Sequence, residues 1–407
     1  MQGAANTEGN NVQALQELVG LAEVEKAALG ISATAQEIAQ QPKTWRGTRE
    51  VFMVQAERLR SFLEAAGVTG PAEERPCVVL TGAGTSDYIG QVLTLLLRRE
   101  WRCEVQAIAS TDLLMNLSDY LVPGRRYLVI SFSRSGDSPE GVTGLSQMLA
   151  KYPDLSHLVV SCNAHGRMAE IARGRKNAYA LVLDDVVNDR GLAMTSSFSN
   201  MVVLGQCLAH AWSTEAYDGI FDALVEAGEA FLLTAGAAVR ELVEKRYERV
   251  CVLGSGALTG VARESALKVG EMTAGRVSTM SDSVLGLRHG PMAALDRHTL
   301  LICFASGDAR RQRYEVDLLR EIASKDVVAQ RVVIGPAEAK ALADCSERYL
   351  AIQPGVPDLY RPPVDVIFGQ LLGLYSSMAL GLKPDAPSPG GVITRVVGEF
   401  NLYETVA

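Results

Sequence analysis

Two distant stretches of this chain repeat the same order of an apolar run, a glycine turn and a helical pattern. LTGAGTS at 80–86 is echoed by LGSGALT at 253–259, and YLVISFSRSGD at 127–137 is echoed by TLLICFASGD at 299–308. Short apolar runs rich in β-branched residues are typical of buried parallel strands. The duplication therefore predicts an α/β chain with two tandem domains, each a flavodoxin-like, doubly wound parallel sheet flanked by helices.

The sequence also predicts where the parts of the chain begin and end. We expect an N-terminal helical segment at 1–50, a first α/β domain at 51–215, a helical linker at 216–246, a second α/β domain at 247–382 and a tail at 383–407. The tail is rich in proline and glycine but keeps several aliphatic side chains. It is therefore expected to dock over the site as an extended segment.

Composition excludes several classes of function. The 407 residues carry a net charge of −8, which argues against broad binding to nucleic acid or to an anionic membrane. The seven cysteines form no CxxC motif, and several lie in strand-like runs, which predicts a reduced, cytoplasmic protein. No apolar run has the length of a membrane span. The five histidines show no metal-ligand spacing, so we expect no metal site.

Hydroxyl-rich turns follow two strands of the first half, and each turn opens a predicted helix. Backbone N–H groups and hydroxyls at a helix start can bind an anion. One such turn would be interpreted as an ordinary helix cap, but two in successive units favour phosphate binding. A later turn of small residues, which contains Ser196, belongs to the same set of candidates. The candidate substrate-binding residues are Gly84, Thr85, Ser86, Ser133, Arg134, Ser135, Ser138 and Ser196.

The second half carries charged residues instead. Glu264, Lys268 and Glu271 stand at i, i+4 and i+7 of a predicted helix, so they share one face. One interpretation is a solvated stripe with a favourable Glu–Lys pair. Another, favoured by the glycine turn at the end of a parallel strand, is a site of proton transfer. His289 follows on a rigid RHGP loop, beyond a glycine- and serine-rich excursion at 274–286 that we expect to leave its own sheet.

Together these motifs resemble the double sugar-isomerase (SIS) domain family. LTGAGTS, SFSRSGDSPE, DRGLAMTSS, LGSGALTGVARESALKV, RHGP and PSPGGVITRVV are all similar to the motifs of one group within it. This is the galactosamine-6-phosphate deaminase/isomerase group, long labelled tagatose-6-phosphate ketose/aldose isomerase. The resemblance covers nearly everything after about Thr34.

The resemblance implies roles for individual residues. Glu271 would be the proton-transferring carboxylate, Lys268 its supporting cation and His289 the ring-opening residue, while the hydroxyl-rich turns would form the phosphate cradle. Arg395 stands where the related glucosamine-6-phosphate synthase has a Schiff-base lysine, and a guanidinium cannot act as an amine nucleophile. The synthase's second-position cysteine is also replaced, by Gln2. Both departures fit degradation rather than synthesis.

The implied activity is the conversion of an amino-hexose 6-phosphate, expected to be D-galactosamine 6-phosphate, to tagatose 6-phosphate and ammonia. No metal or redox cofactor is implied. A plain aldose–ketose isomerase would use the same residues, so the sequence does not separate the two activities. A sugar-phosphate-sensing regulator would need the cradle but neither Glu271 nor His289, and the N-terminal segment shows no basic helix for DNA. The resemblance also implies a homodimer or higher homo-oligomer with shared active sites, in which His289 reaches the neighbouring subunit's site.

Overall fold

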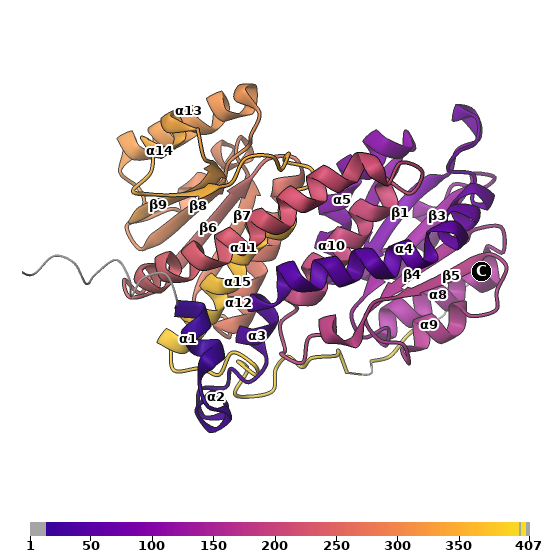
Figure 1. Cartoon of the computed structure of the whole chain (residues 1–407), viewed down its shortest axis with the longest axis horizontal. Helices are drawn as coiled ribbons and strands as arrows, with labels where there is room; N and C mark the ends of the chain where they lie inside the picture. Colours follow the sequence, from indigo (N-terminus) through magenta and orange to yellow (C-terminus); the bar gives the residue numbers. More distant parts are fainter. Residues whose placement is uncertain (1–13, 399, 404–407) are drawn as a thin grey trace, which may run out of the picture. The chain divides into compact units, whose positions relative to one another are not determined.

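A computed structural model describes residues 14–398 and 400–403 of the chain, and these contain two five-stranded sheets (Figure 1). Every strand pair in both sheets is parallel. The first sheet consists of β1 (Cys77–Gly82), β2 (Val105–Ala109), β3 (Tyr127–Ser133), β4 (Ser156–Ser161) and β5 (Ala178–Val182). The second consists of β6 (Arg249–Gly254), β7 (Ser278–Ser283), β8 (Thr299–Phe304), β9 (Gln330–Pro336) and β10 (Arg348–Ile352).

The strand order confirms the predicted duplication. The first sheet has the order β2-β1-β3-β4-β5, and the second, read from its β7 edge, repeats it as β7-β6-β8-β9-β10. In each sheet the chain first moves to one side of the starting strand and then crosses to the other side. The carboxyl ends of β1 and β3, and those of β6 and β8, are therefore topological switch points, where ligands bind in open α/β sheets.

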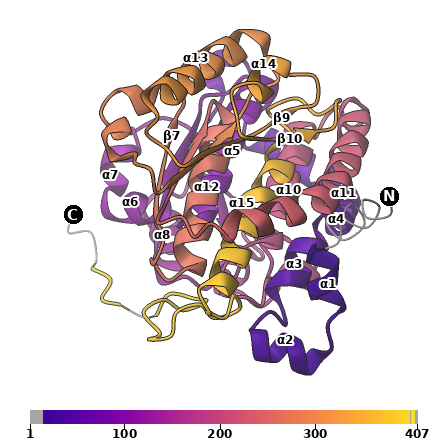
Figure 2. The same cartoon turned by 90° about the vertical axis from the view of Figure 1, so that its left-hand side faces the viewer.

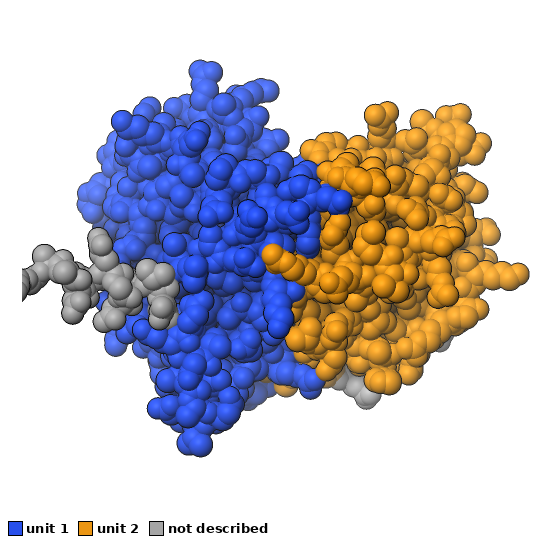
Figure 3. Space-filling view, viewed as in Figure 1, with its two compact units in different colours: residues 1–43, 189–199, 218–392 blue, residues 44–188, 200–217, 393–407 orange. Residues whose placement is uncertain are grey.

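The described residues fall into two compact units, coloured separately in Figure 3. Unit 1 contains the second sheet and unit 2 contains the first. Unit 1 comprises 14–43, 189–199 and 218–392, and unit 2 comprises 44–188, 200–217, 393–398 and 400–403. The units are defined by which residues pack together, not by continuous stretches of sequence. The domain boundaries expected from the sequence therefore stay a prediction.

Helices precede, connect and flank the strands. In the first half of the chain they are α1 (Ala14–Gly20), α2 (Glu23–Leu29), α3 (Thr34–Ala39), α4 (Gln41–Ala65), α5 (Thr85–Trp101), α6 (Ser110–Met115), α7 (Leu117–Tyr120), α8 (Pro139–Lys151), α9 (Arg167–Ala172) and α10 (Ser196–Ala209). In the second half they are α11 (Glu215–Val243), α12 (Ala257–Met272), α13 (Ala309–Lys325), α14 (Lys340–Ala343) and α15 (Pro362–Ala379). Within 14–398 and 400–403, no helix combines the length and the apolar character needed to cross a bilayer.

One expectation about the second domain is wrong. The excursion at 274–286 does not leave its sheet, because Ser278–Ser283 forms β7 and pairs with β6. This strand, STMSDS, lies at the edge of the sheet, and none of its residues is fully buried. A half-exposed edge strand needs few apolar residues, so the sequence lacked the alternation by which strands are recognised.

Close packing of two helices positions the charged face of α12 in unit 1. Helices α12 and α15 lie side by side (Figure 2). A Cβ atom at Gly369 of α15 would lie 2.4 Å from the Cβ of Ser265, and one at Gly373 would lie 2.9 Å from the backbone oxygen of Lys268. These two glycines are one helical turn apart. Their missing side chains allow the backbone of α15 to approach the turns of α12 that carry the charged residues.

We predict that Gly369→Ala destabilises the protein, while Gly219→Ala in α11 does the opposite. Both substitutions replace glycine inside a helix, which alone favours alanine by about 0.5–1 kcal/mol. A Cβ at Gly219 has no neighbour within 4 Å, so that gain should be realised there. At Gly369 the clash with Ser265 should outweigh it and lower the free energy of unfolding by about 1–3 kcal/mol.

Urea unfolding followed by circular dichroism measures both variants. Equal stabilisation of the two would show that the close approach of α15 to α12 imposes no constraint.

Candidate active site

The two hydroxyl-rich turns of unit 2 lie at the same switch point. β1 and β3 are hydrogen-bonded neighbours, and their register brings their carboxyl ends level. Gly84, with a φ of 56°, precedes α5, and Thr85 and Ser86 begin this helix as buried residues. Ser138 precedes α8, whose first residue is a proline. The amino-terminal ends of α5 and α8 thus follow adjacent strand ends, which is the arrangement that binds anions.

The loop after β3 is shaped by its own serine hydroxyls. The Gly136 N–H donates to Ser133 Oγ at 3.0 Å, and the Asp137 N–H donates to Ser135 Oγ at 3.2 Å. A hydroxyl that accepts a hydrogen bond keeps its own proton for another acceptor. The Ser138 side chain forms no capping hydrogen bond with α8, so it is not an ordinary helix cap. The loop therefore presents hydroxyl donors that suit an anion.

The tail reaches this loop within unit 2. Arg134 is buried, and its Nη2 donates to the backbone oxygen of Arg395 at 2.5 Å. The Arg395 guanidinium in turn donates to Oδ1 of Asn188 at 2.7 Å. The structure thus brings together two of the predicted site residues that are 261 positions apart in the sequence. The tail thereby brings a second arginine, Arg395, to the arginine of the hydroxyl-rich loop.

In unit 1 the predicted charged face of α12 is present and mostly buried. Lys268 Nζ lies 2.6 Å from Oε2 of Glu271 and 3.4 Å from Oε1 of Glu264. The side chains of Lys268 and Glu264 are 0% exposed, whereas that of Glu271 is 25% exposed. A solvated stripe is excluded by this burial. Glu271 is the member of the cluster that a ligand can reach.

The Lys268 ammonium stays protonated despite its burial. Desolvation lowers the pKa of Lys268, but the carboxylates of Glu264 and Glu271 outweigh this effect and raise it above its ordinary value. The cluster therefore contains one fixed positive charge between two carboxyl groups. In a site of low dielectric constant such a charge strongly influences an adjacent carboxylate.

Ser196 and His289 belong to unit 1, whereas the other candidate substrate-binding residues belong to unit 2. The Ser196 N–H donates to Asp189 Oδ1 at 3.0 Å, and the same buried carboxylate accepts the N–H groups of Thr195 and Ser197. Asp189 thus caps α10, and sequence analysis had not singled it out, although it belongs to the DRGLAMTSS motif. His289 is exposed and follows a short 3-10 turn, where its N–H donates to the backbone oxygen of Gly286.

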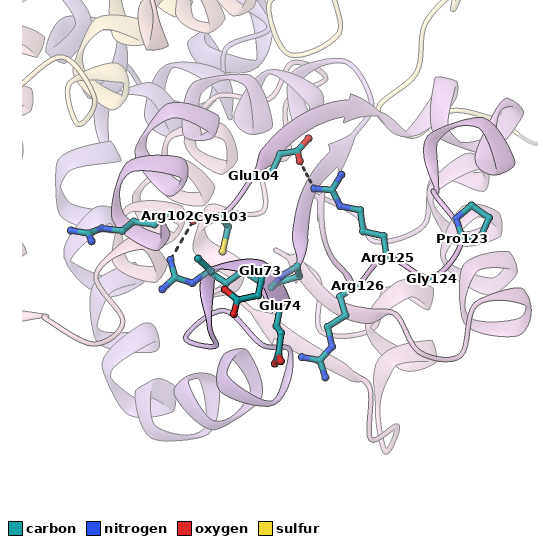
Figure 4. Close-up of a pocket in the computed structure, with 12 residues that line it drawn as sticks. Glu73, Glu74, Arg102, Cys103, Glu104, Pro123, Gly124, Arg125 and Arg126 are labelled. Carbon is teal, nitrogen blue, oxygen red and sulfur yellow. Dashed lines mark hydrogen bonds and ion pairs between the residues drawn. The ribbon is translucent and has the colours of Figure 1, made fainter.

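A large cavity in unit 2 is lined by none of the predicted site residues. It has a volume of about 880 Å³ and a lining rich in Arg and Glu (Figure 4). Pro76, Glu104 and Arg126 of its lining directly precede β1, β2 and β3, so it opens at the amino edge of the sheet, opposite the cradle. Its arginines include Arg75, which donates to backbone oxygens at the end of α5, and Arg125, which pairs with Glu104. These contacts serve the fold.

In residues 14–398 and 400–403, no group of three or more His, Cys, Asp or Glu side chains could hold a metal ion. The predicted site residues contribute the hydroxyls and guanidinium of the cradle in unit 2, and the carboxylate beside Lys268 in unit 1.

We predict that Lys268→Met lowers the free energy of unfolding by about 3–5 kcal/mol near neutral pH, because it leaves the buried Glu264 carboxylate without its ammonium partner. Lowering the pH should reduce this loss, since protonation removes the buried charge. In the wild type, the raised pKa of Lys268 keeps the ion pair intact at neutral pH, and its stabilisation is lost only as the pH rises through that pKa.

The matched control is Lys325→Met on α13, where the ammonium pairs with Glu321 at 2.6 Å but is half exposed. Exposed pairs contribute little, so this variant should unfold almost like the wild type. Denaturant titrations at neutral and mildly acidic pH make the comparison. Equal losses for the two variants would contradict the burial argument.

Known proteins are similar to this chain over almost its whole length. A candidate D-galactosamine-6-phosphate deaminase AgaS of Streptomyces coelicolor is 37% identical over 376 residues, covering 91% of this chain and 95% of the relative. The D-galactosamine-6-phosphate deaminase AgaS of Escherichia coli is 35% identical over 378 residues, covering 89% and 94%. The crystal structure of a candidate tagatose-6-phosphate ketose/aldose isomerase of Clostridium novyi superposes with a TM-score of 0.88 at 33% identity, covering 95% of this chain and 99% of that one.

No protein-family model matches the chain. More distant phosphosugar enzymes of known structure, below 25% identity, share the fold alone. The predicted tandem SIS fold is confirmed by these structures and by the two parallel sheets. The prediction of a sugar-phosphate enzyme rather than a sensor is confirmed as well, because the relatives are deaminases or ketose/aldose isomerases by name. The chain belongs to the AgaS family of galactosamine-6-phosphate deaminases and tagatose-6-phosphate isomerases.

Proposed function

We propose that this protein is a deaminating isomerase that converts D-galactosamine 6-phosphate to tagatose 6-phosphate and ammonia. The names of its relatives support this substrate. The observation that carries the proposal is the α12 cluster, in which a partly exposed Glu271 carboxylate lies 2.6 Å from the buried ammonium of Lys268. A carboxylate held beside a fixed positive charge suits the removal of a proton from carbon.

In this proposal the cradle binds the substrate's phosphate. The donors are the hydroxyls of the two turns, the N–H groups at the starts of α5 and α8, and the Arg134 guanidinium, namely Gly84, Thr85, Ser86, Ser133, Arg134, Ser135 and Ser138. The buried positions of Thr85, Ser86 and Ser133 support the assignment, because hydroxyls held by packing are already oriented for an anion. Ser196 is proposed as a further contact from the start of α10.

The chemistry then needs two proton-transfer groups. His289 would transfer the proton that opens the sugar ring, and Glu271 would take the proton from C2 while the C1 oxygen is protonated. The resulting enolamine would be stabilised by positive charge from Lys268 or Arg395. Reprotonation at C1 gives an imine at C2, and addition of water then releases ammonia and leaves the ketone.

The second candidate activity is plain ketose/aldose isomerisation. The name of the Clostridium novyi structure supports this alternative. With a hydroxyl at C2 the same proton transfers give a ketose without consuming water. The two activities differ in a single product, ammonia. We also propose a cytoplasmic location, which is supported by the seven buried cysteines without disulfides.

We predict that the purified protein releases ammonia from galactosamine 6-phosphate, and that Glu271→Gln abolishes this release while the substrate still binds. The amide keeps the shape of the side chain but cannot accept the C2 proton. Coupled ammonia assays across a panel of hexosamine and hexose 6-phosphates measure turnover. Calorimetric titration measures binding, and loss of the C2 hydrogen in heavy water measures proton removal.

Glu226→Gln serves as the matched control, because Glu226 is an exposed glutamate of α11. It should turn over substrate like the wild type. If the Glu271→Gln variant exchanges the C2 hydrogen at the wild-type rate, Glu271 is not the base. If the wild type isomerises hexose 6-phosphates but releases no ammonia from any hexosamine, the isomerase alternative holds.

We further propose a homodimer with shared sites, in which His289 serves the neighbouring subunit's site. The exposure of His289 on its loop supports this arrangement. Mixing the inactive variants Glu271→Gln and His289→Ala should then restore part of the activity, because one of the two sites in each hybrid contains both groups intact.

Size-exclusion chromatography with light scattering gives the oligomeric state. Exchange between differently tagged subunits must be demonstrated first, and a mixture of Glu271→Gln with wild type shows how exchange alone changes activity. If tagged subunits exchange and no activity returns in the hybrid of the two inactive variants, His289 acts within its own chain.

A further inference from the structure

The second domain contains a counterpart of the phosphate loop. β8 occupies the place in its sheet that β3 occupies in the first, and each is the strand across the switch point from the first strand of its sheet. The loop SRSGD at 133–137 becomes ASGD at 305–308, one residue shorter, and leads into α13. Ser306 and Gly307 thus correspond to Ser135 and Gly136 of the cradle. The duplicated fold has produced a second potential anion site in unit 1.

This second loop is occupied by a carboxylate of the chain itself. Asp358, from the segment between β10 and α15, accepts the Gly307 N–H through Oδ1 at 2.7 Å. Its Oδ2 accepts the hydroxyl of Ser306 and an Nη1 hydrogen of Arg311, the latter at 3.2 Å. The Asp358 side chain is only 10% exposed. A loop N–H, a hydroxyl and a guanidinium are the donors that proteins use to hold phosphate.

A second arginine also lies close to the Asp358 carboxylate. Arg361 is buried, and its Nη1 lies 3.7 Å from Asp358 Oδ1. Two further contacts hold it in place, from Nε to Asp365 at 2.7 Å and from Nη2 to the backbone oxygen of Ala305 at 2.5 Å. Arg361 therefore keeps its position without depending on Asp358. Removal of the Asp358 side chain would leave the Arg311 guanidinium, the Ser306 hydroxyl and the Gly307 N–H without this acceptor, while Arg361 stays paired with Asp365.

We propose that Asp358 is an internal counter-ion that fills a latent phosphate site in the second SIS domain. Each chain then binds a single phosphorylated sugar, through the hydroxyl cradle of the first domain. The anion that fits the latent site is inorganic phosphate or the phosphate group of a small ester, because a loop N–H, a hydroxyl and a guanidinium are donors that hold phosphate oxygens. This assignment goes beyond the proposed activity and does not depend on which sugar phosphate is the substrate.

The test distinguishes phosphate binding at the loop after β8 from phosphate binding at the cradle. In a background with Ser133→Ala, Ser135→Ala and Ser138→Ala, binding to the cradle is weakened, and we expect inorganic phosphate to leave the melting temperature unchanged. Adding Asp358→Ala should produce a saturable rise in melting temperature with phosphate concentration, since a ligand that binds only the folded state stabilises it. Calorimetric titration should then give a stoichiometry of one phosphate per chain. Potassium chloride at equal ionic strength controls for salt.

Two further variants sharpen the result. Asp317→Ala, an exposed aspartate of α13, is the matched control in the same background and should not create phosphate binding. Adding Arg311→Ala to the Asp358→Ala variant should weaken the new binding about tenfold or more, because a charge-assisted hydrogen bond is lost.

The proposal is overturned if Asp358→Ala responds to phosphate no more than Asp317→Ala does. Should the Asp358→Ala variant be unfolded in phosphate-free buffer, phosphate must restore its native circular dichroism spectrum, and failure to do so also overturns the proposal. Turnover is not measured in any of these experiments. Failure of the ammonia assay and failure of the phosphate titration are therefore separate outcomes.

Discussion

In a parallel sheet the carboxyl ends of all strands lie on one edge. In both sheets of this protein the chain adds its second strand on one side of the first strand and its third strand on the other side. This change of side leaves a crevice at the carboxyl ends of β1 and β3, and another at the carboxyl ends of β6 and β8. Backbone N–H groups at the following helix starts give each place a positive character. The chemistry of the molecule therefore depends on what the sequence supplies there: serine hydroxyls after β3, a charged helix after β6, and an aspartate from elsewhere beside the loop after β8.

Packing and electrostatics are coupled in the second domain. Burying an ammonium costs several kcal/mol unless carboxylates compensate for the lost water, and Glu264 and Glu271 provide that compensation for Lys268. The burial itself depends on Gly369 and Gly373, whose lack of side chains brings α15 against α12. Two residues with no functional group thus determine the dielectric environment in which a carboxylate works. Because the buried Lys268 ammonium contacts it, the Glu271 carboxylate is held in place before a ligand arrives.

Much of this organisation could be predicted from the sequence, because local patterns carry it. The duplicated strand and turn motifs gave both sheets, and helical spacing placed Glu264, Lys268 and Glu271 on one face. Burial of that face was not predictable, since charged residues four apart have the same spacing in solvent and in a core. β7 was missed because an edge strand needs no apolar alternation. Asp358 was missed because its partner Gly307 lies 51 residues away, and only the fold brings the two together.

Neither compact unit is a continuous piece of chain. Residues 189–199 belong with the second sheet, and Arg395 contacts the loop after the third strand of the first sheet. Contacts over such separations form late, because the loop-closure entropy must be overcome first. During synthesis the first sheet can assemble early, but Arg134 cannot gain its tail partner until residues near 395 have left the ribosome. The duplicated halves therefore cannot be separated by a cut in the connecting helix α11, since such a cut would leave each half without segments that complete it.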